Sequence, residues 1–149
     1  MISNPKEYYP PMHTAEHILN RTMVRLFKTE RSFSNHIEKK KSKCDYHFSR
    51  NLTEKEIQNL EDEINKVIRQ NLEVTEIKIS LEEAKERFLL DRLPENHGDE
   101  IRIINVGNYD SCMCSGLHVK NTKEIGQVKT LSTSFENNVL RIRFKLHGK

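Results

Sequence analysis

The 149-residue sequence has no tryptophan, only five glycines and four prolines, and no low-complexity stretch. This scarcity excludes collagen-like, mucin-like and flexible-linker sequences. No apolar run approaches the ~18 residues that a membrane-spanning helix needs. The first residues, Met1 to Glu7, contain no apolar signal core. We therefore expect a cytoplasmic protein with no membrane partner.

Cysteine is also scarce, and neither sign of charge is in large excess. Three cysteines cannot all pair with one another, and Cys112 and Cys114 are too close in sequence to form a comfortable disulfide. A reducing compartment or a bound metal explains them better than a disulfide framework. The 25 Lys and Arg residues against 22 Asp and Glu give a net charge of +3. Such a small excess permits a nucleic-acid partner only if the positive charge is clustered.

The periodicity of the apolar residues predicts one domain over residues 1–149 that mixes helices and strands. Helices are expected over residues 12–29, 51–71 and 80–91. Strands are expected twice within residues 33–49, then over 75–79, 101–106, 109–113, 125–135 and 139–147. In the last strand apolar residues alternate with Arg141, Arg143, Lys145 and His147, so one face is buried and the other is positively charged. The predicted fold class is α+β, a mostly antiparallel sheet with helices packed on it.

Two motifs contain residue types that bind metals. His13 and His17 are four positions apart in the first predicted helix, so both imidazoles lie on one face of that helix. Cys114 and His118 have the same spacing where a predicted strand gives way to a loop. Three imidazoles and one thiolate form a tetrahedral set suited to zinc. Each motif alone is more typical of surface or capping residues, and the fold has to bring the two halves together.

Other residues with chemical potential have simpler structural interpretations. The basic run of Lys39, Lys40, Lys41 and Lys43 is either a solvated hairpin turn or a contact for phosphate groups. Cys112 is more typical of a strand residue that points away from Cys114 than of a spare ligand. His47 is expected on the opposite strand face from its apolar neighbours. Glu16 stands in the order HTAEH, which does not match the HExxH pattern of zinc proteases, so no general-base role is implied.

The residues that flank these motifs resemble the editing domain of alanyl-tRNA synthetases. Residues 13–19, HTAEHIL, are similar to its HTAxHLL segment, and residues 114–119, CSGLHV, are similar to its CGGTHV segment. Residues 45–53, DYHFSRNLT, resemble its RFDFS…LT segment, and residues 120–126 resemble the stretch that ends in T-x-E-I-G. The sequence leaves no room for an aminoacylation module or a Gly-rich β-barrel. It is therefore similar to the short, free-standing AlaX type of trans-editing protein.

This resemblance implies an editing-domain-like sandwich, as in the second additional domain of threonyl- and alanyl-tRNA synthetases. It implies Zn²⁺ as the cofactor, with His13, His17, Cys114 and His118 as the ligands. It also implies hydrolysis of mischarged tRNA(Ala), with seryl-tRNA(Ala) or glycyl-tRNA(Ala) as the substrate. Thr14 is predicted to hydrogen-bond a substrate serine, so Thr14→Val should weaken discrimination between seryl and alanyl esters.

The sequence departs from the family pattern at Ser115 and Leu117, and residues 34–38 replace the family's Q-x-G-S-x-V segment. A polar group that positions water is therefore expected from His36 or Asn35. The tRNA is expected to contact the basic run over residues 39–43. Two other hypotheses stay open: a non-catalytic, zinc-stabilised tRNA-binding module, and a metal-dependent hydrolase of a small amino-acid ester.

Overall fold

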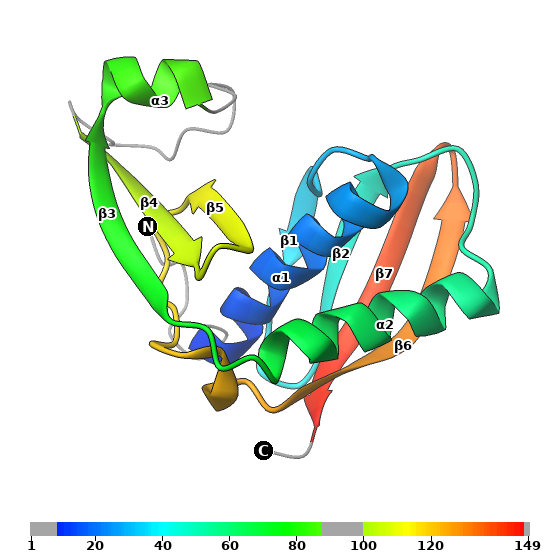
Figure 1. The fold of residues 1–149 in the computed structure, drawn as a ribbon. Coiled ribbons are helices and arrows are strands. Elements are labelled where there is room, and N and C mark those ends of the chain that lie inside the picture. The colour runs from blue at the N-terminus through cyan, green and yellow to red at the C-terminus, as the bar shows by residue number, and fades with distance from the viewer. Residues whose placement is uncertain (1–8, 88–99, 148–149) are drawn as a thin grey trace.

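The computed structural model describes residues 9–87 and 100–147, which form three helices and two antiparallel sheets (Figure 1). The helices are α1 (Pro10–Phe27), α2 (Glu54–Ile68) and α3 (Leu81–Arg87), with a short 3-10 turn η2 (Thr122–Glu124). The strands are β1 (Ser34–His36), β2 (Ser42–His47), β3 (Val74–Ser80), β4 (Glu100–Val106), β5 (Asp110–Met113), β6 (Gln127–Glu136) and β7 (Val139–His147). The α+β prediction is confirmed. The strands divide between two sheets, with orders β1-β2-β7-β6 and β3-β4-β5, and the sequence pattern alone does not reveal this division.

The main core lies between the four-stranded sheet and the helices α1 and α2 (Figure 1). In β7 the residues Leu140, Ile142 and Phe144 are all at most 1% exposed, and they alternate with basic residues as the sequence predicted. Burying each of these side chains stabilises the fold by about 1.5–3 kcal/mol. The strand β7 is joined to β6 by a tight turn in which Asn137 and Asn138 both have positive φ, the conformation that a two-residue hairpin requires.

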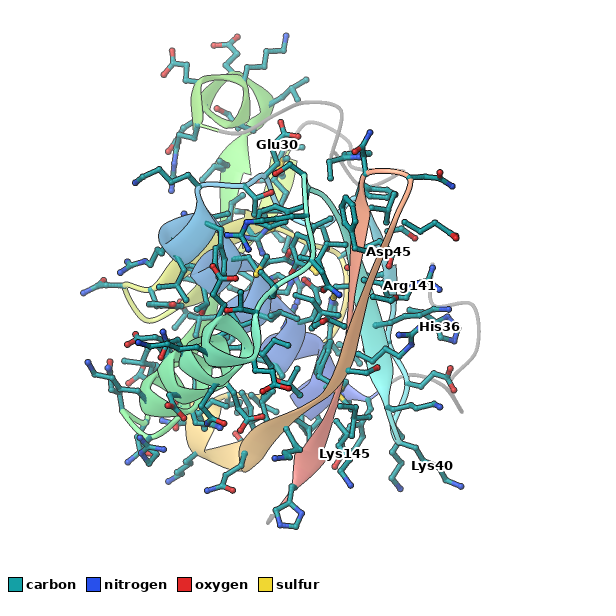
Figure 2. The ribbon with its side chains drawn as sticks, turned by 90° about the vertical axis from the view of Figure 1, so that its right-hand side faces the viewer. Glu30, His36, Lys40, Asp45, Arg141 and Lys145 are labelled. Atoms are coloured by element: carbon teal, nitrogen blue, oxygen red, sulfur yellow. The ribbon has the colours of Figure 1, made fainter. Side chains whose placement is uncertain are left out.

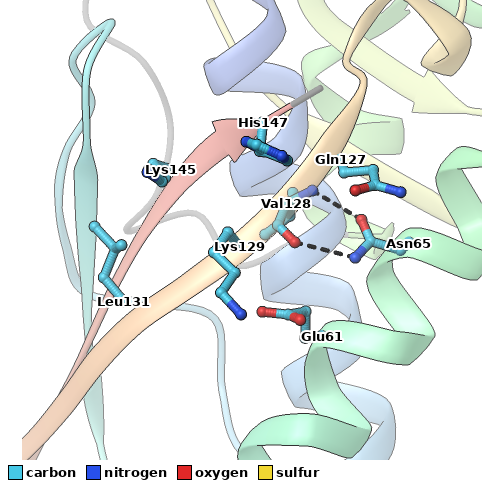
Figure 3. A pocket seen from close by; sticks show the side chains of 8 residues that line it. All are labelled: Glu61, Asn65, Gln127, Val128, Lys129, Leu131, Lys145 and His147. Atoms are coloured by element: carbon cyan, nitrogen blue, oxygen red, sulfur yellow. Dashed lines mark hydrogen bonds between the residues drawn. The ribbon is translucent and has the colours of Figure 1, made fainter. Parts of the chain in front are cut away.

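The edge strand β6 is held by side chains of α2 in place of a neighbouring strand (Figure 3). The Asn65 amide accepts from Val128 N at 2.8 Å and donates to Val128 O at 3.0 Å. Glu61 Oε1 accepts from Thr130 N at 2.7 Å. These bonds satisfy the free edge of the sheet and fix α2 across its face.

The helix α2 begins with a capping box. Thr53 Oγ1 accepts from Glu56 N at 3.1 Å, and Glu56 Oε1 accepts from Thr53 N at 2.9 Å. We predict that Thr53→Ala lowers the free energy of unfolding by about 1 kcal/mol, because it leaves one helix donor without its cap. Chemical denaturation measures this change in the free energy of unfolding. The exposed neighbour Ser49→Ala serves as the control and should leave stability nearly unchanged.

The three-stranded sheet has a smaller core of its own. Ile79, Ala84, Ile101, Ile103 and Met113 pack together between this sheet and α3. The predicted continuation of the third helix to residue 91, and the loop with His97, lie outside the described residues. No helix in the described parts of the chain has the length and apolarity to cross a membrane.

The strand β5 contacts α1, and this contact joins the two sheets. The loop that follows β5 also lies against the first half of α1, where Thr14 contacts His118 and Val119. The histidine pair His13 and His17 lies on this helix, and the pair Cys114 and His118 lies on this loop.

Candidate metal centre

Helix α1 carries the first half of the site. It begins with Pro10 and Pro11, which suit the first helical turn because that turn needs no backbone N–H partner within the helix. His13 and His17 follow on the inner side, with His17 only 2% exposed. The two rings lie edge to face with centroids 5.2 Å apart. The helical spacing therefore points both imidazoles toward the loop after β5.

The loop after β5 carries the second half, and its backbone is fixed by Arg102 of β4. Arg102 donates to the carbonyl of Cys114 at 2.8 Å and to that of Gly116 at 2.7 Å. Gly116 N lies 3.4 Å from Cys114 Sγ, as a donor toward the sulfur. On its other side Arg102 is paired with Glu76 of β3 at 2.7 Å. The three-stranded sheet thus presents the Cys114 thiol and the His118 imidazole to α1.

The four predicted ligands come together in the structure. One ligand atom from each of His13, His17, Cys114 and His118 can be chosen so that all four lie within 4.8 Å of one another. Cys114 Sγ is 3.5 Å from His13 Nε2 and 3.4 Å from His118 Nε2. Zinc bonds of about 2.0 Å to nitrogen and 2.3 Å to sulfur, at a tetrahedral angle, separate these atoms by about 3.5 Å. The donor set and its spacing therefore fit a zinc ion.

The three imidazoles stabilise the thiolate form of Cys114. Burial opposes its ionisation, but hydrogen bonds from His118, His13 and His17 outweigh burial and lower the pKa of Cys114 to about 2. Burial likewise disfavours the charged form of His118 and lowers its pKa to about 4, although Cys114 partly offsets this. A thiolate beside a neutral imidazole is the protonation state that a metal requires.

Cys112, two residues earlier, is a partly buried thiol like Cys114 but differs from it in its surroundings. It lies in β5 opposite Ile104 of β4 and does not belong to the ligand group found among the described residues. Burial raises the pKa of the Cys112 thiol, so this side chain stays protonated. Cys112 therefore lies in a strand, as predicted.

A buried carboxylate that the sequence analysis missed lies behind His17. Asp110, 3% exposed, has its Oδ2 atom 3.5 Å from His17 Nδ1. Arg31 binds the two carboxylate oxygens at 2.8 and 3.2 Å, and Arg21 donates to Oδ1 at 3.0 Å. Burial would raise the pKa of Asp110, but the charges of His17 and Arg31 hold it below the usual range. With its Nδ1 facing this carboxylate, His17 directs Nε2 toward the metal centre.

A second line of buried polar groups extends from the metal centre to β1. Glu16 Oε1 lies 3.8 Å from His13 Nε2, and Glu16 Oε2 accepts from the Asn20 amide. Asn20 Oδ1 accepts from Ser32 N at 2.7 Å, and Ser32 Oγ contacts Asn35 Oδ1. Glu16 is only 5% exposed. Its carboxylate is therefore the acidic group that the fold holds beside the ligand His13.

The structure gives Thr14 a different position from the predicted one. Its side chain has no exposed surface, and Oγ1 accepts from Val119 N at 3.2 Å and lies 3.0 Å from His118 Nδ1. Thr14 thus connects α1 to the ligand His118. A hydrogen bond from Thr14 to a substrate serine stays a prediction.

The structure also separates His36 from the metal centre. His36 is exposed on the face of β1 that points away from the helices, where it pairs with Glu38 (Figure 2). Its register partner is Lys43, whereas that of Asn35 is the buried Cys44. Because cross-strand partners share a face, Asn35 lies on the same sheet face as Cys44, although all three residues of this edge strand are exposed. A second exposed histidine of this face, His47, stacks on Phe33.

The basic run forms the tip between β1 and β2, as predicted, with Lys43 inside β2. Lys39 Nζ lies 5.8 Å from the ring centroid of Tyr9, the residue that caps α1. His13 donates its backbone N–H to Tyr9 O at 3.0 Å. The tip therefore lies one helical turn from the first metal ligand, and its contact with phosphate stays a prediction.

Comparison with known proteins identifies sequences that are similar to this chain. Residues 101–143 match the family described as the threonyl and alanyl tRNA synthetase second additional domain. The chain is 35% identical over 124 residues to an alanine–tRNA ligase of Fervidobacterium nodosum. This match covers 82% of the chain and 14% of that ligase. It is 30% identical over 121 residues to the corresponding ligase of Fusobacterium nucleatum, covering 80% of the chain and 14% of the ligase. The chain thus spans about one seventh of the length of these relatives.

Proposed function

We propose that this chain, a member of the family of the threonyl- and alanyl-tRNA synthetase second additional domain, hydrolyses mischarged tRNA(Ala) in trans, with zinc as its cofactor. Seryl-tRNA(Ala) is the first candidate substrate and glycyl-tRNA(Ala) the second. The observation that carries this proposal is the buried group of three histidines and one cysteine in a chain of this family. The proposal includes a single editing domain over residues 1–149 and a cytoplasmic location.

The reaction requires little beyond positioning. An aminoacyl ester is already activated, so the site has to orient a water molecule and stabilise the developing oxyanion. Bound zinc supplies a Lewis acid that can polarise a carbonyl or acidify water. A site with four protein ligands has no vacant position, however. A side chain of the protein therefore has to accept the proton of the attacking water.

We assign Glu16 as the general base that accepts this proton. Its Oε1 atom faces the ligand His13 at 3.8 Å, and the Asn20 amide holds the other oxygen. A carboxylate fixed at one oxygen keeps the second available as a proton acceptor. The assignment differs from the zinc-protease pattern in sequence order, because Glu16 directly precedes His17 rather than following His13.

We predict that Glu16→Gln lowers the deacylation rate by about 10²–10⁴-fold, the usual contribution of a general base. Zinc content should not change, because Glu16 is not one of the four ligands. The exposed Glu30→Gln, beyond the C-terminal end of the same helix, is the control for loss of one carboxylate and should retain full activity (Figure 2). A Glu16→Gln protein with the wild-type rate would remove Glu16 from the mechanism.

A non-catalytic, zinc-stabilised tRNA-binding module is the second candidate. The complete four-ligand set favours it, since closed sites are typical of structural zinc. A panel of seryl-tRNA(Ala), glycyl-tRNA(Ala), seryl-tRNA(Thr) and alanyl-tRNA(Ala) separates the two functions. Editing predicts release of serine from seryl-tRNA(Ala) with alanyl-tRNA(Ala) spared. A zinc-loaded protein that deacylates none of the four would decide for the binding module.

A further inference from the structure

The outer face of the four-stranded sheet is basic. Helices α1 and α2 cover the inner face, while Asp45, Arg141 and their neighbours project from the outer one (Figure 2). From the strand registers, this outer face carries the basic residues Lys43, Lys129, Arg141, Arg143 and Lys145. The acidic residues of its strands are Asp45 and Glu136. We call this surface the basic sheet face.

Like charges face one another across its strands. Lys43 of β2 is the register partner of Arg143 of β7, and Lys145 of β7 is the partner of Lys129 of β6. Directly opposed like charges destabilise a sheet, and a complementary pair in the same place would contribute about 0.2–1 kcal/mol. The pairing of Lys43 with Arg143 is therefore unfavourable for the isolated fold.

The nearby carboxylate of Asp45 forms its ion pair with Arg141 and not with Lys43 or Arg143, although the charges of all three cations lower its pKa, that of Arg141 most. Arg141 binds Asp45 through two bonds of 2.8 and 2.9 Å, which shows that the face forms ion pairs where an acid is present. Arg143 instead contacts the hydroxyls of Ser132 and Ser134 at 3.3 and 3.4 Å. Within residues 9–87 and 100–147, no carboxylate oxygen lies within 4.0 Å of the charged nitrogens of Lys43 or Arg143.

The basic sheet face continues into the approach to the metal centre. At the end of β2 that holds Lys43, the chain turns through the tip with Lys39, which lies against Tyr9 at the start of α1. At the β6 edge, Lys129 and Lys145 line a hollow together with Leu131 and Glu61 (Figure 3). A polyanion that lies on the sheet can therefore pass the tip to the start of α1, one helical turn before His13.

We propose that the basic sheet face binds the phosphate backbone of the tRNA acceptor stem, with Lys43 and Arg143 at its centre and the 3′ end passing the Lys39 tip. This proposal rests on the proposed function, since it gives the substrate of that site its docking surface. Phosphates neutralise the opposed cations, and the Ser132 and Ser134 hydroxyls add hydrogen bonds of the kind that phosphate oxygens accept. Backbone contacts of this type orient an RNA without reading its sequence.

The test compares wild-type protein with the double variant Lys43→Gln, Arg143→Gln. Binding of an acceptor-stem minihelix is measured across a salt series, with zinc content and unfolding free energy measured in parallel. We expect roughly tenfold weaker binding and a log–log salt slope that is shallower by about one to two. Zinc content should stay the same, and stability should be equal or higher because the repulsion is gone. A merely structural role predicts lower stability instead.

The matched control neutralises two exposed lysines on α2, with Lys55→Gln and Lys66→Gln. It removes the same charge from a helix that lies on the opposite side of the sheet and should bind the minihelix like the wild type. Equal affinity and slope for the wild type and the Lys43, Arg143 variant would overturn the docking surface, even with deacylation intact. Wild-type binding to anionic lipid vesicles but not to the minihelix would also overturn it. Binding through this face without hydrolysis of any aminoacyl ester would instead contradict the proposed function and leave the surface standing.

Discussion

The variant Cys114→Ala is expected to lose the metal while keeping the fold. Cys114 contributes the thiolate of the group, with Sγ 3.5 and 3.4 Å from the nearest imidazole nitrogens. Zinc sites of this kind bind with about 10–16 kcal/mol, so removal of one of four ligands weakens binding roughly a hundredfold or more. Competition with a chromophoric chelator measures this affinity, and elemental analysis gives the zinc content.

Cys112→Ala is the matched control for this experiment. It removes a second partly buried thiol from the same strand end, yet Cys112 lies outside the ligand group and its pKa is raised by burial. Zinc affinity should equal that of the wild type. Full retention of zinc by Cys114→Ala, or equal loss from both variants, would show that the proposed ligand set is wrong.

The second large effect is expected from Asp110→Asn, which acts on the metal through His17. The carboxylate lies 3.5 Å from His17 Nδ1, and residues that support a ligand imidazole in this way change metal affinity by about 10–100-fold when substituted. The change also leaves Arg31 and Arg21 without their acid. Breaking a buried ion pair costs about 3–5 kcal/mol, and we expect the low end because Arg21 is 31% exposed.

The variant Asp45→Asn is the control for Asp110→Asn. Asp45 also binds an arginine through two bonds, but that pair lies on the outer sheet face, which points away from the helices (Figure 2). Its loss should cost at most about 1 kcal/mol and leave zinc affinity unchanged. If Asp110→Asn binds cobalt with the wild-type affinity and absorption spectrum, Asp110 does not position His17.

The sequence predicts local elements here better than their assembly. The alternation in β7 and the capping box of α2 involve neighbours in the chain, so the pattern identifies them directly. The division of the strands into two sheets depends on partners distant in sequence, such as β2 with β7. The alternation of apolar and polar residues along each strand is the same whether the strands form one sheet or two. The sequence therefore indicates one sheet where the structure has two.

The metal ligands were predicted because their spacing and flanking residues resemble a known family. Their supporting residues carry no such signal. Arg31 and Asp110 meet across 79 positions, and a lone aspartate at the start of a strand is unremarkable in sequence. Glu16 was set aside because its position in the motif is unusual, although the fold places its carboxylate at His13.

The segment before β2 shows how strand register decides between neighbours. His36 and Asn35 were equal candidates for positioning water, and a one-residue step moves a side chain to the other face of a strand. The pairing of Asn35 with Cys44 places Asn35 on the same sheet face as Cys44 and His36 on the opposite face. Thr14 likewise adjoins His13 in sequence, but its buried hydroxyl contacts His118 and Val119.

The central claim is that this chain deacylates mischarged tRNA(Ala) through the site formed by α1 and the loop after β5. The most direct measurement is the rate of serine release from seryl-tRNA(Ala) as zinc is titrated into metal-free protein. We predict a rate that rises with added zinc, reaches a plateau at one equivalent per chain, and is absent from Cys114→Ala. A rate that does not depend on zinc, or no hydrolysis at full zinc loading, would contradict the account.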